Sequence, residues 1–326
     1  MIEHGGNLDW AIKNFGGKKK EWIDLSTGIN PNSYPLETIQ SSEFQALPTQ
    51  SDIKNLVQIA REYYKTNADI TAVSGVQTAI NIFPYLFSRG NVSIIEPTYN
   101  EYKNAFSNAN WKVNIFKNLN NLQGSNLAII CNPNNPDGKI ISKEQLIDLS
   151  TKVGFLIIDE SFMDLYPNQS LSGEITKDKK NIIVLKSFGK FFGLAGVRLG
   201  FILSSKKIAK HIEKFLGPWQ ISNLAIIAGV KALKDKLWIS KNIESLKTNS
   251  SILDNLADSI NLKLLGGTYL YRLYETSNSL ELQNKFATKM IWTRTFSYSK
   301  HWIRLGLPNE KLNSELSLRF SEINHN

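Results

Sequence analysis

The chain of 326 residues contains one cysteine, four histidines and no long hydrophobic run. A single cysteine, Cys131, excludes an internal disulfide and fits a reducing compartment, so we expect a cytoplasmic protein. The longest apolar stretches, such as residues 155–158, are only as long as a strand, which argues against a membrane span. The first ten residues lack a basic segment followed by an apolar run, and we expect no signal peptide.

Positive charge exceeds negative charge, giving a formal net charge of +9. Such an excess attracts anions, either a phosphorylated ligand or nucleic acid. However, the lysines are scattered along the chain, for example at residues 18–20, 177–180 and 206–210, and no basic stripe is interleaved with aromatic residues. No zinc-finger spacing is present either. We therefore interpret most of this charge as a solvated surface, and we predict no nucleic acid, no membrane partner and no metal.

The length favours two linked domains, and a content of 42% hydrophobic and 21% charged residues is ordinary for a globular protein. Residues 1–40 are rich in Gly, Asn, Pro and Ser, and we predict an extended amino-terminal arm with turns. Residues 41–215 are expected to form a large α/β domain, and residues 216–326 a small α+β domain.

Short runs rich in Ile and Val alternate with helical patterns in the large domain. The predicted helices cover residues 52–65 with Asp52 as N-cap, 76–87, 99–108, and 143–152 capped by Ser142. This alternation predicts a mostly parallel, seven-stranded sheet with helices on both faces. The expected strands are residues 70–73, 92–95, 112–116, 127–131, 155–159, 182–186 and 199–203.

The pattern changes after residue 205, where helical segments dominate to about residue 257. A further helix is expected at residues 279–290. Short strands are expected at residues 262–264, 268–273, 291–293 and 302–305.

Two turns at predicted strand ends have the composition of a ligand site, and open α/β sheets bind ligands at this edge. Residues 74–77 (Ser-Gly-Val-Gln) open a helix, whose free backbone N–H groups suit a phosphate. Residues 132–138 (Asn-Pro-Asn-Asn-Pro-Asp-Gly) form a rigid turn. Taken alone, each segment is more typical of a structural turn.

Asp159 and Glu160 end the apolar run at residues 155–158, at the edge of a dry core. A carboxylate there needs a cationic partner, because its desolvation otherwise costs several kcal/mol. A protonated ring nitrogen would serve. A helix N-cap or a magnesium ligand are the alternatives at this point.

Lys190 lies in the segment Ser-Phe-Gly-Lys-Phe-Phe-Gly at residues 187–193. Neighbouring phenylalanines would desolvate the lysine, which lowers its pKa and favours the free amine that forms imines. Ser187 and Arg198 can both reach one phosphate, the arginine through two parallel hydrogen bonds. The alternative is a surface lysine in a glycine-rich loop, and the spacing of a Walker-type phosphate loop is absent.

In this order along the chain, the four segments resemble the fold-type I pyridoxal 5′-phosphate (PLP) enzymes of the aminotransferase class I/II superfamily. The resemblance covers nearly the whole chain. It rests on N-P-N-N-P-D-G at 132–138, I-I-D-E at 157–160, S-F-G-K at 187–190, and Arg198. It implies PLP as cofactor and a homodimer, because fold-type I active sites lie at subunit interfaces.

The resemblance also implies residue roles. Lys190 would hold PLP as a Schiff base and shuttle protons, and Asp159 would pair with the ring nitrogen. Asn135 would bond the ring oxygen, while Tyr99 stacks on the ring. The cofactor phosphate would be bound by Gly75, Val76, Ser187 and Arg198.

Two positions depart from the pattern of many relatives. Phe162 stands where they carry a tyrosine that bonds the ring oxygen. Leu47-Pro48 stands where they place a tyrosine that contributes to the partner's phosphate site. Each missing hydrogen bond is worth about 0.5–1.5 kcal/mol. Both departures weaken the simplest aminotransferase interpretation.

Within the superfamily the chain most resembles the threonine-phosphate decarboxylases, which are related to the histidinol-phosphate aminotransferases. This resemblance implies decarboxylation of L-threonine O-3-phosphate to (R)-1-aminopropan-2-yl phosphate in cobalamin biosynthesis. The motifs are H-G-G-N at 4–7, L-S-T-G-I-N-P at 25–31, S-F-G-K-F-F-G-L-A-G-V-R-L-G-F at 187–201, L-G-P-W at 216–219 and W-I-R-L-G-L-P at 302–308.

The same resemblance implies that Arg304 grips the substrate carboxylate together with Asn135. We place the substrate phosphate near the glycine-rich amino terminus, where Gly5-Gly6 gives backbone N–H groups close approach to an anion. A solvated terminal His4 is the alternative there. The predicted substrate residues are His4, Gly5, Gly6, Asn7, Thr27, Gly28, Asn30, Asn135, Arg294 and Arg304.

Two other functions stay open. A histidinol-phosphate-type aminotransferase would share all the cofactor residues. A non-catalytic PLP-fold regulator would carry an added DNA-binding domain, for which residues 1–40 are too short and too rich in Gly and Pro.

Overall fold

The computed structural model describes residues 4–176 and 179–323, which belong to two compact units. Unit 1 comprises Met1–Ser33, Pro136–Gly138 and Trp238–Asn326, so it contains both ends of the chain. Unit 2 comprises Tyr34–Asn135 and Lys139–Leu237. The three-part division at residues 40 and 215 stays a prediction.

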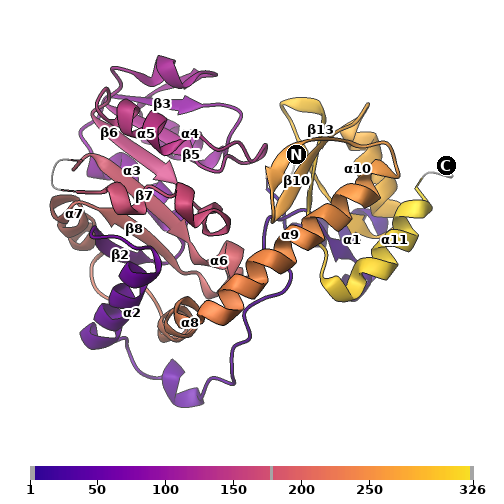
Figure 1. The fold of residues 1–326 in the computed structure, drawn as a ribbon, viewed down its shortest axis with the longest axis horizontal. Coiled ribbons are helices and arrows are strands. Elements are labelled where there is room, and N and C mark those ends of the chain that lie inside the picture. Colours follow the sequence, from indigo (N-terminus) through magenta and orange to yellow (C-terminus); the bar gives the residue numbers. More distant parts are fainter. Residues whose placement is uncertain (1–3, 177–178, 324–326) are drawn as a thin grey trace. The chain divides into compact units, whose positions relative to one another are not determined.

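Unit 2 contains a seven-stranded sheet with the strand order β2-β8-β7-β6-β5-β3-β4 (Figure 1). The pairs from β7 to β4 are parallel, whereas β8 is antiparallel to both of its neighbours. The predicted mostly parallel, seven-stranded sheet is confirmed. Its strands are β2 (Asp69–Val73), β3 (Asn91–Ile95), β4 (Lys112–Phe116), β5 (Leu127–Cys131), β6 (Phe155–Asp159), β7 (Ile182–Ser187) and β8 (Gly200–Ser204).

Residues that alternate along the strands pack on opposite faces of this sheet. Ile157 and Leu185 face a core that also contains Phe83 and Phe106. On the other face, the ring of Tyr64 lies 5.8 Å from that of Phe201. The helices are α2 (Gln50–Tyr63), α3 (Val76–Leu86), α4 (Glu101–Asn108), α5 (Lys143–Ser150), α6 (Phe188–Phe191), α7 (Lys206–Leu216) and α8 (Asn223–Lys234).

The cap of α2 differs from the prediction. Thr49 is the N-cap, and Asp52 is the third helical residue of a capping box. The Thr49 side chain accepts a hydrogen bond from the Asp52 backbone, and the Asp52 carboxylate accepts one from Thr49. The helix therefore begins two residues earlier than expected. Ser142 caps α5 as predicted.

Unit 1 contains an antiparallel four-stranded sheet, with the order β12-β13-β10-β9, and a parallel pair, β1 with β11. The strands are β1 (Ile23–Asp24), β9 (Lys263–Thr268), β10 (Tyr271–Glu275), β11 (Ile291–Trp292), β12 (Arg294–Phe296) and β13 (Ser299–Gly306). The helices are α1 (Leu8–Phe15), α9 (Lys236–Asp258), α10 (Ser279–Thr288) and α11 (Asn313–Ser321), of which α9 begins at the end of unit 2.

Two predictions in this part of the chain were wrong. The arm is not extended throughout, because α1 buries Ala11 against Trp22 and Trp292. The strand expected at residues 268–273 is interrupted: β9 ends at Thr268 and β10 begins at Tyr271, forming a hairpin.

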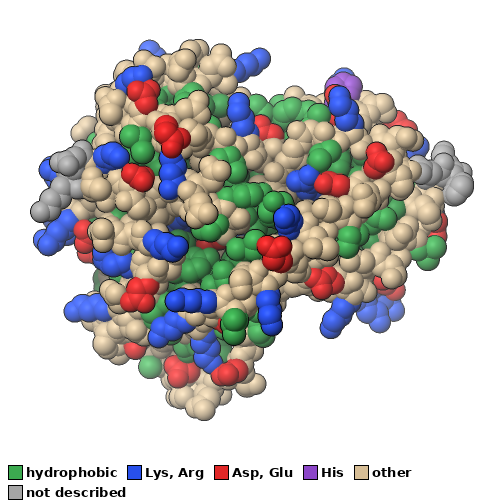
Figure 2. Space-filling model, in the orientation of Figure 1, with side chains coloured by type: hydrophobic (Ala, Val, Ile, Leu, Met, Phe, Trp, Pro, Cys, Tyr) green, Lys and Arg blue, Asp and Glu red, His purple; other side chains and the backbone are tan. Residues whose placement is uncertain are grey.

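Lysine and arginine side chains are spread over the face shown in Figure 2, with aspartate and glutamate among them. Within residues 4–176 and 179–323, no helix is both long and apolar enough to span a membrane.

Candidate active site

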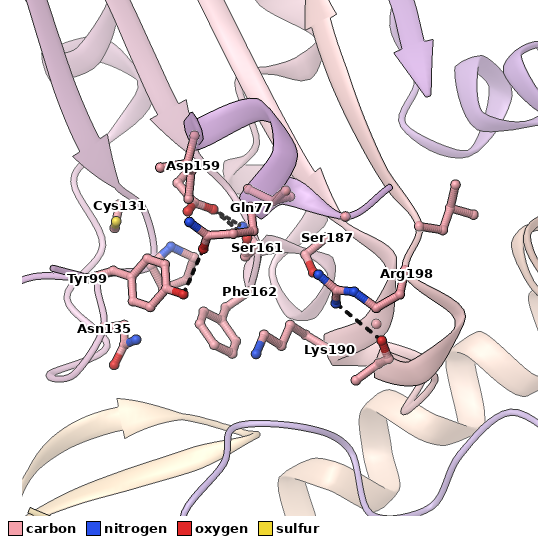
Figure 3. A pocket seen from close by; sticks show the side chains of 17 residues that line it. Gln77, Tyr99, Cys131, Asn135, Asp159, Ser161, Phe162, Ser187, Lys190 and Arg198 are labelled. Atoms are coloured by element: carbon pink, nitrogen blue, oxygen red, sulfur yellow. Dashed lines mark hydrogen bonds between the residues drawn. The ribbon is translucent and has the colours of Figure 1, made fainter. Parts of the chain in front are cut away.

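A single cavity in unit 2 is lined by all eight predicted cofactor residues (Figure 3). The residues come from the ends of β6 and β7, the start of α3, helix α6, and the loops that follow β3, β5 and α6. The structure therefore brings the four sequence segments together, while the role of each residue stays a prediction. The eight are Gly75, Val76, Tyr99, Asn135, Asp159, Ser187, Lys190 and Arg198.

One part of the cavity suits a phosphate. Gly75 is the N-cap of α3 and has a φ of 79°, and a Cβ there would lie 2.7 Å from Nη2 of Arg198. Glycine thus lets the guanidinium approach the first turn of the helix, whose N–H groups point outward. Ser187, the last residue of β7, adds a hydroxyl to the same cavity. These are the donors that a phosphate needs.

Asp159 brings a buried carboxylate to the cavity. Its Oδ1 accepts hydrogen bonds from the Ser161 backbone (2.9 Å) and hydroxyl (2.5 Å), and its Oδ2 accepts one from Tyr102 (2.7 Å). Burial raises the pKa of Asp159, and these bonds and the nearby Lys190 oppose the rise. A cationic N–H group in the cavity would stabilise the ionised form further.

Lys190 of α6 extends its amine into the cavity, where Nζ lies 5.8 Å from the centroid of the Phe162 ring. Phe188 and Phe192, which flank the lysine in sequence, are fully buried and stack at 4.7 Å. Two buried, stacked aromatic rings therefore support the lysine, which lines the cavity.

Tyr99 and Asn135 are held in place by polar contacts. The Tyr99 hydroxyl donates to Oε1 of Gln77 at 3.1 Å. The turn that carries Asn135 is fixed by Asn132, which exchanges two hydrogen bonds with the backbone of Ile141. These contacts limit the movement of the cavity wall.

The predicted carboxylate-binding residue, Arg304, lies in unit 1 on β13, directly opposite Arg294 on β12. Burial lowers the pKa of Arg304 to about 10, so it remains protonated at neutral pH. Its Nη2 donates to the Ser26 carbonyl at 2.8 Å, and Ser26 Oγ accepts a bond from Gly6 N at 2.7 Å. Arg304 and the glycine-rich segment therefore share Ser26.

Other predicted substrate residues have structural contacts within unit 1. Asn7 caps α1 by accepting from Trp10 N at 3.2 Å. The Asn30 amide donates to Asn242 at 2.9 Å, and its oxygen accepts from Asn32 N. His4 is exposed, Gly5 and Thr27 are half-buried, Gly28 is buried, and the tenth predicted residue, Asn135, belongs to unit 2. Their substrate roles stay predictions.

Three residues at the site were missed by the sequence interpretation. Gln77 is two residues beyond Gly75 at the start of α3, and Ser161 is two residues beyond Asp159. Tyr102 lies on α4, and only its hydrogen bond to Asp159 marks it as part of the site, so no local signal in the sequence identified it.

Comparisons with known proteins agree with this geometry. The family model of aminotransferase class I and II matches residues 20–316. A threonine-phosphate decarboxylase of a Sinorhizobium species is 34% identical over 314 residues, covering 94% of this chain and 93% of the relative. A threonine-phosphate decarboxylase of Pseudomonas aeruginosa is 31% identical over 318 residues, covering 95% and 94%.

Among solved structures, histidinol-phosphate aminotransferase from Sinorhizobium meliloti in complex with pyridoxal 5′-phosphate has a TM-score of 0.85 at 16% identity. The match covers 97% of this chain and 94% of that one, and it shows the fold. The fold is that of the fold-type I PLP-dependent enzymes. The chain belongs to the aminotransferase class I and II family, and its cofactor is PLP.

The cavity residues fit this cofactor. Gly75, at the cap of α3, leaves room for the Arg198 guanidinium where a phosphate is expected, and Asp159 offers a buried carboxylate to a ring nitrogen. The Lys190 amine supplies the group that binds an aldehyde.

Proposed function

We propose that this protein is a lyase that releases CO₂ from L-threonine O-3-phosphate and yields (R)-1-aminopropan-2-yl phosphate for cobalamin biosynthesis. Two facing arginines in unit 1 carry the proposal, because they call for a substrate with more than one anionic group. The relatives named threonine-phosphate decarboxylase support it. We further propose a homodimer in the cytoplasm, and sedimentation analysis of the PLP-loaded enzyme tests the dimer.

Arg294 and Arg304 are direct cross-strand partners. Like charges in this arrangement repel each other, and an anion that contacts both arginines reduces the repulsion. The Arg304 guanidinium lies 5.1 Å from the ring of Tyr271, and that of Arg294 lies 5.3 Å from Phe296. These rings restrain both guanidinium planes. We assign the substrate carboxylate to Arg304 and the substrate phosphate to Arg294 with the amino-terminal segment.

The chain's own groups would have distinct tasks in this reaction. Arg304 would orient the carboxylate that leaves as CO₂. The Lys190 amine would then deliver a proton to the carbon atom from which the carboxylate was lost. Asp159 holds a proton at the ring nitrogen. When bound, PLP supplies the electron sink for the pair left on that carbon. A proton replaces the lost carboxylate, so the reaction needs no second substrate.

That stoichiometry separates the proposal from a histidinol-phosphate-type aminotransferase. The enzyme loaded with PLP is incubated with L-threonine O-3-phosphate and no oxo acid, and CO₂ and the amine phosphate are measured. We expect repeated turnover with one CO₂ per amine formed. Turnover only after addition of 2-oxoglutarate, without CO₂, would establish transamination instead.

A matched substrate and a variant sharpen this assay. L-threonine lacks the phosphate and should react poorly with the wild-type enzyme, because the second anion site stays empty. In Arg294→Gln the advantage of the phosphorylated substrate should shrink. Equal activity of the wild-type enzyme on both substrates would contradict a phosphate-specific site. Turnover of neither substrate would reject the decarboxylase proposal as a whole.

A further inference from the structure

Two consecutive polar residues stand at the end of each of the strands β6 and β7 and project to opposite faces of the sheet: Asp159, the last residue of β6, with Glu160 directly after it, and Lys186 with Ser187, the last two residues of β7. Asp159 and Ser187 continue the face of Ile157 and Leu185 and line the cavity. Because strand side chains alternate, Glu160 and Lys186 lie on the opposite face. The ladder extends to this point, since Glu160 N donates to the Leu185 carbonyl at 2.9 Å.

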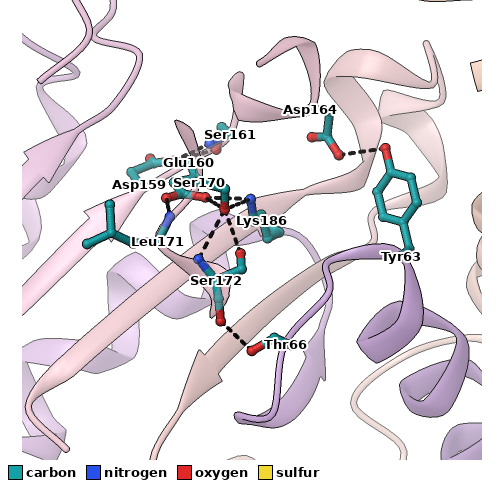
Figure 4. Close-up of polar contacts among 10 residues, drawn as sticks. All are labelled: Tyr63, Thr66, Asp159, Glu160, Ser161, Asp164, Ser170, Leu171, Ser172 and Lys186. Atoms are coloured by element: carbon teal, nitrogen blue, oxygen red, sulfur yellow. Dashed lines mark hydrogen bonds and ion pairs between the residues drawn. The ribbon is translucent and has the colours of Figure 1, made fainter. Parts of the chain in front are cut away.

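Glu160 and Lys186 form a buried ion pair behind the cavity (Figure 4). Lys186 Nζ lies 2.5 Å from Glu160 Oε2, and the side chains are 3% and 0% exposed. Ser170 Oγ donates to Glu160 Oε2 at 2.5 Å and accepts from Lys186 at 2.9 Å. The Leu171 backbone donates to Glu160 Oε1 at 2.7 Å. Both carboxylate oxygens are thus engaged.

Stability alone is a poor explanation for this pair. A buried ion pair pays a large desolvation cost, and replacement by apolar side chains of similar volume is often neutral or stabilising. What the pair provides is a short, directional link between two adjacent strand ends, because each partner is one residue from a cavity residue. Apolar side chains would leave these ends freer to slide.

We propose that Glu160 and Lys186 are positioning residues that set the separation between Asp159 and Ser187, and thereby match the cavity to a ligand held at both its ring nitrogen and its phosphate. This inference rests on the assignment of Asp159 to the ring nitrogen and Ser187 to the phosphate. It adds a function for the face of the sheet that the ligand does not touch.

The double variant E160Q/K186M tests the proposal. It removes both charges together, so neither is left buried without its partner, and it keeps similar side-chain volumes. Dissociation constants are measured for PLP and for pyridoxal, which lacks the phosphate and engages the ring end alone. We expect PLP binding to weaken about tenfold, as for other residues that orient ligand-binding groups. Pyridoxal binding should weaken much less.

Control variants separate positioning from general loss of stability. Ile183→Ala destabilises β7 from the core face, away from the ion pair, and should leave the ratio of the two dissociation constants unchanged. Glu160→Asp keeps both charges of the ion pair but shortens the acidic side chain. It should shift the ratio of the two dissociation constants as the double variant does. This second variant maintains the test if the double variant does not fold.

Two further variants test the assignment on which the inference rests. Asp159→Asn should weaken both ligands, and Ser187→Ala should weaken PLP alone. If both behave so and the double variant keeps the wild-type ratio, the positioning role is overturned while the site stands. If Asp159→Asn or Ser187→Ala leaves binding unchanged, the assignment fails and the inference fails with it.

Discussion

The Tyr102 hydroxyl donates a hydrogen bond to Oδ2 of Asp159 at 2.7 Å, and both residues are buried. Burial and the neighbouring carboxylate raise the pKa of Tyr102 well above its usual value, so it remains a donor. Burial raises the pKa of Asp159, and the hydrogen bonds from Ser161 and Tyr102 oppose that rise.

Removing that donor should weaken cofactor binding most at low pH. In Tyr102→Phe the pKa of Asp159 rises, so fewer molecules carry the charge that pairs with a ring nitrogen. A hydrogen bond to a charged group is worth about 1.5–3 kcal/mol, which corresponds to roughly a ten- to hundredfold loss of PLP affinity. Titrations across pH should show the acid limb displaced to higher pH.

Tyr63→Phe is the matched control, because Tyr63 makes a similar hydroxyl bond to a different buried carboxylate, Asp164, at 3.0 Å. It should leave the pH profile of PLP binding in place. If the pH profile of Tyr102→Phe coincides with the wild-type profile, the prediction is contradicted, and Ser161 alone is enough to oppose the rise in the pKa of Asp159.

The close approach of Arg198 to Gly75 predicts a specific cost for an added methyl group. In Gly75→Ala the Cβ would lie 2.7 Å from Arg198 Nη2, so the guanidinium must move away from the helix cap. We expect PLP affinity to fall by about tenfold, the equivalent of one charge-assisted bond, with little change for pyridoxal.

Gly124→Ala controls for backbone strain. Gly124 has a φ of 76°, close to that of Gly75, and nothing lies within 4 Å of the added methyl group. It should lose stability to a similar degree without loss of PLP affinity. Equal effects of the two substitutions on PLP binding would count against a phosphate site at Gly75.

Arg304→Lys tests the carboxylate site of the proposed function. Lysine keeps the charge but loses the planar fork that binds a carboxylate through two bonds. We expect the KM for L-threonine O-3-phosphate to rise by about tenfold or more, while PLP binding stays unchanged. Arg319→Lys is the control, since Arg319 bonds the carbonyls of Glu21, Lys289 and Met290. An unchanged KM in Arg304→Lys would remove that residue from the substrate site.

Asp164 predicts a pH dependence of stability. Burial raises its pKa to about 6, although Lys186 opposes this, and Oδ2 has no hydrogen-bond partner among the described residues. The raised pKa means that the folded state holds the proton more tightly. The stabilising contribution of protonated Asp164 is therefore complete when the pH is below 3.8, the ordinary pKa of the group, and is lost as pH rises through about 6.

Asp164→Asn should remove this loss. The shift of about two units corresponds to at most about 3 kcal/mol, so the variant should gain up to that amount at pH 8 and little at pH 4. Urea unfolding at pH 8 and at pH 4 measures the free energy of unfolding of the variant and the wild type. Asp148→Asn, which changes an exposed carboxylate, is the control. A variant less stable than wild type at pH 8 would contradict the raised pKa.

Much of unit 2 was predictable because its strands are short runs of Ile and Val and its turns carry distinctive residues. The position of the cavity segments was predictable because parallel strands bring their carboxyl ends to one edge, whereas the role of each residue came from the family resemblance. Periodicity and turn composition determine these features locally, without knowledge of the packing.

The features that the sequence did not predict depend on contacts between residues that are far apart in sequence. The helix α1 was missed because glycines flank it and its buried face is defined by Trp22 and Trp292. Lys186 looked like an ordinary strand residue, since its partner Glu160 is 26 positions away. Tyr102 became significant only when its hydroxyl was found at Asp159. Such pairings have no local pattern.

Covalent trapping at Lys190 tests the central claim most directly. The enzyme loaded with PLP is reduced with borohydride, digested and analysed by mass spectrometry, in parallel with Lys190→Ala. We predict one phosphopyridoxyl group on Lys190, and the loss in the variant of the near-visible absorbance band that PLP gives with the wild-type enzyme. A label on another lysine, or an unchanged band in Lys190→Ala, would contradict the account.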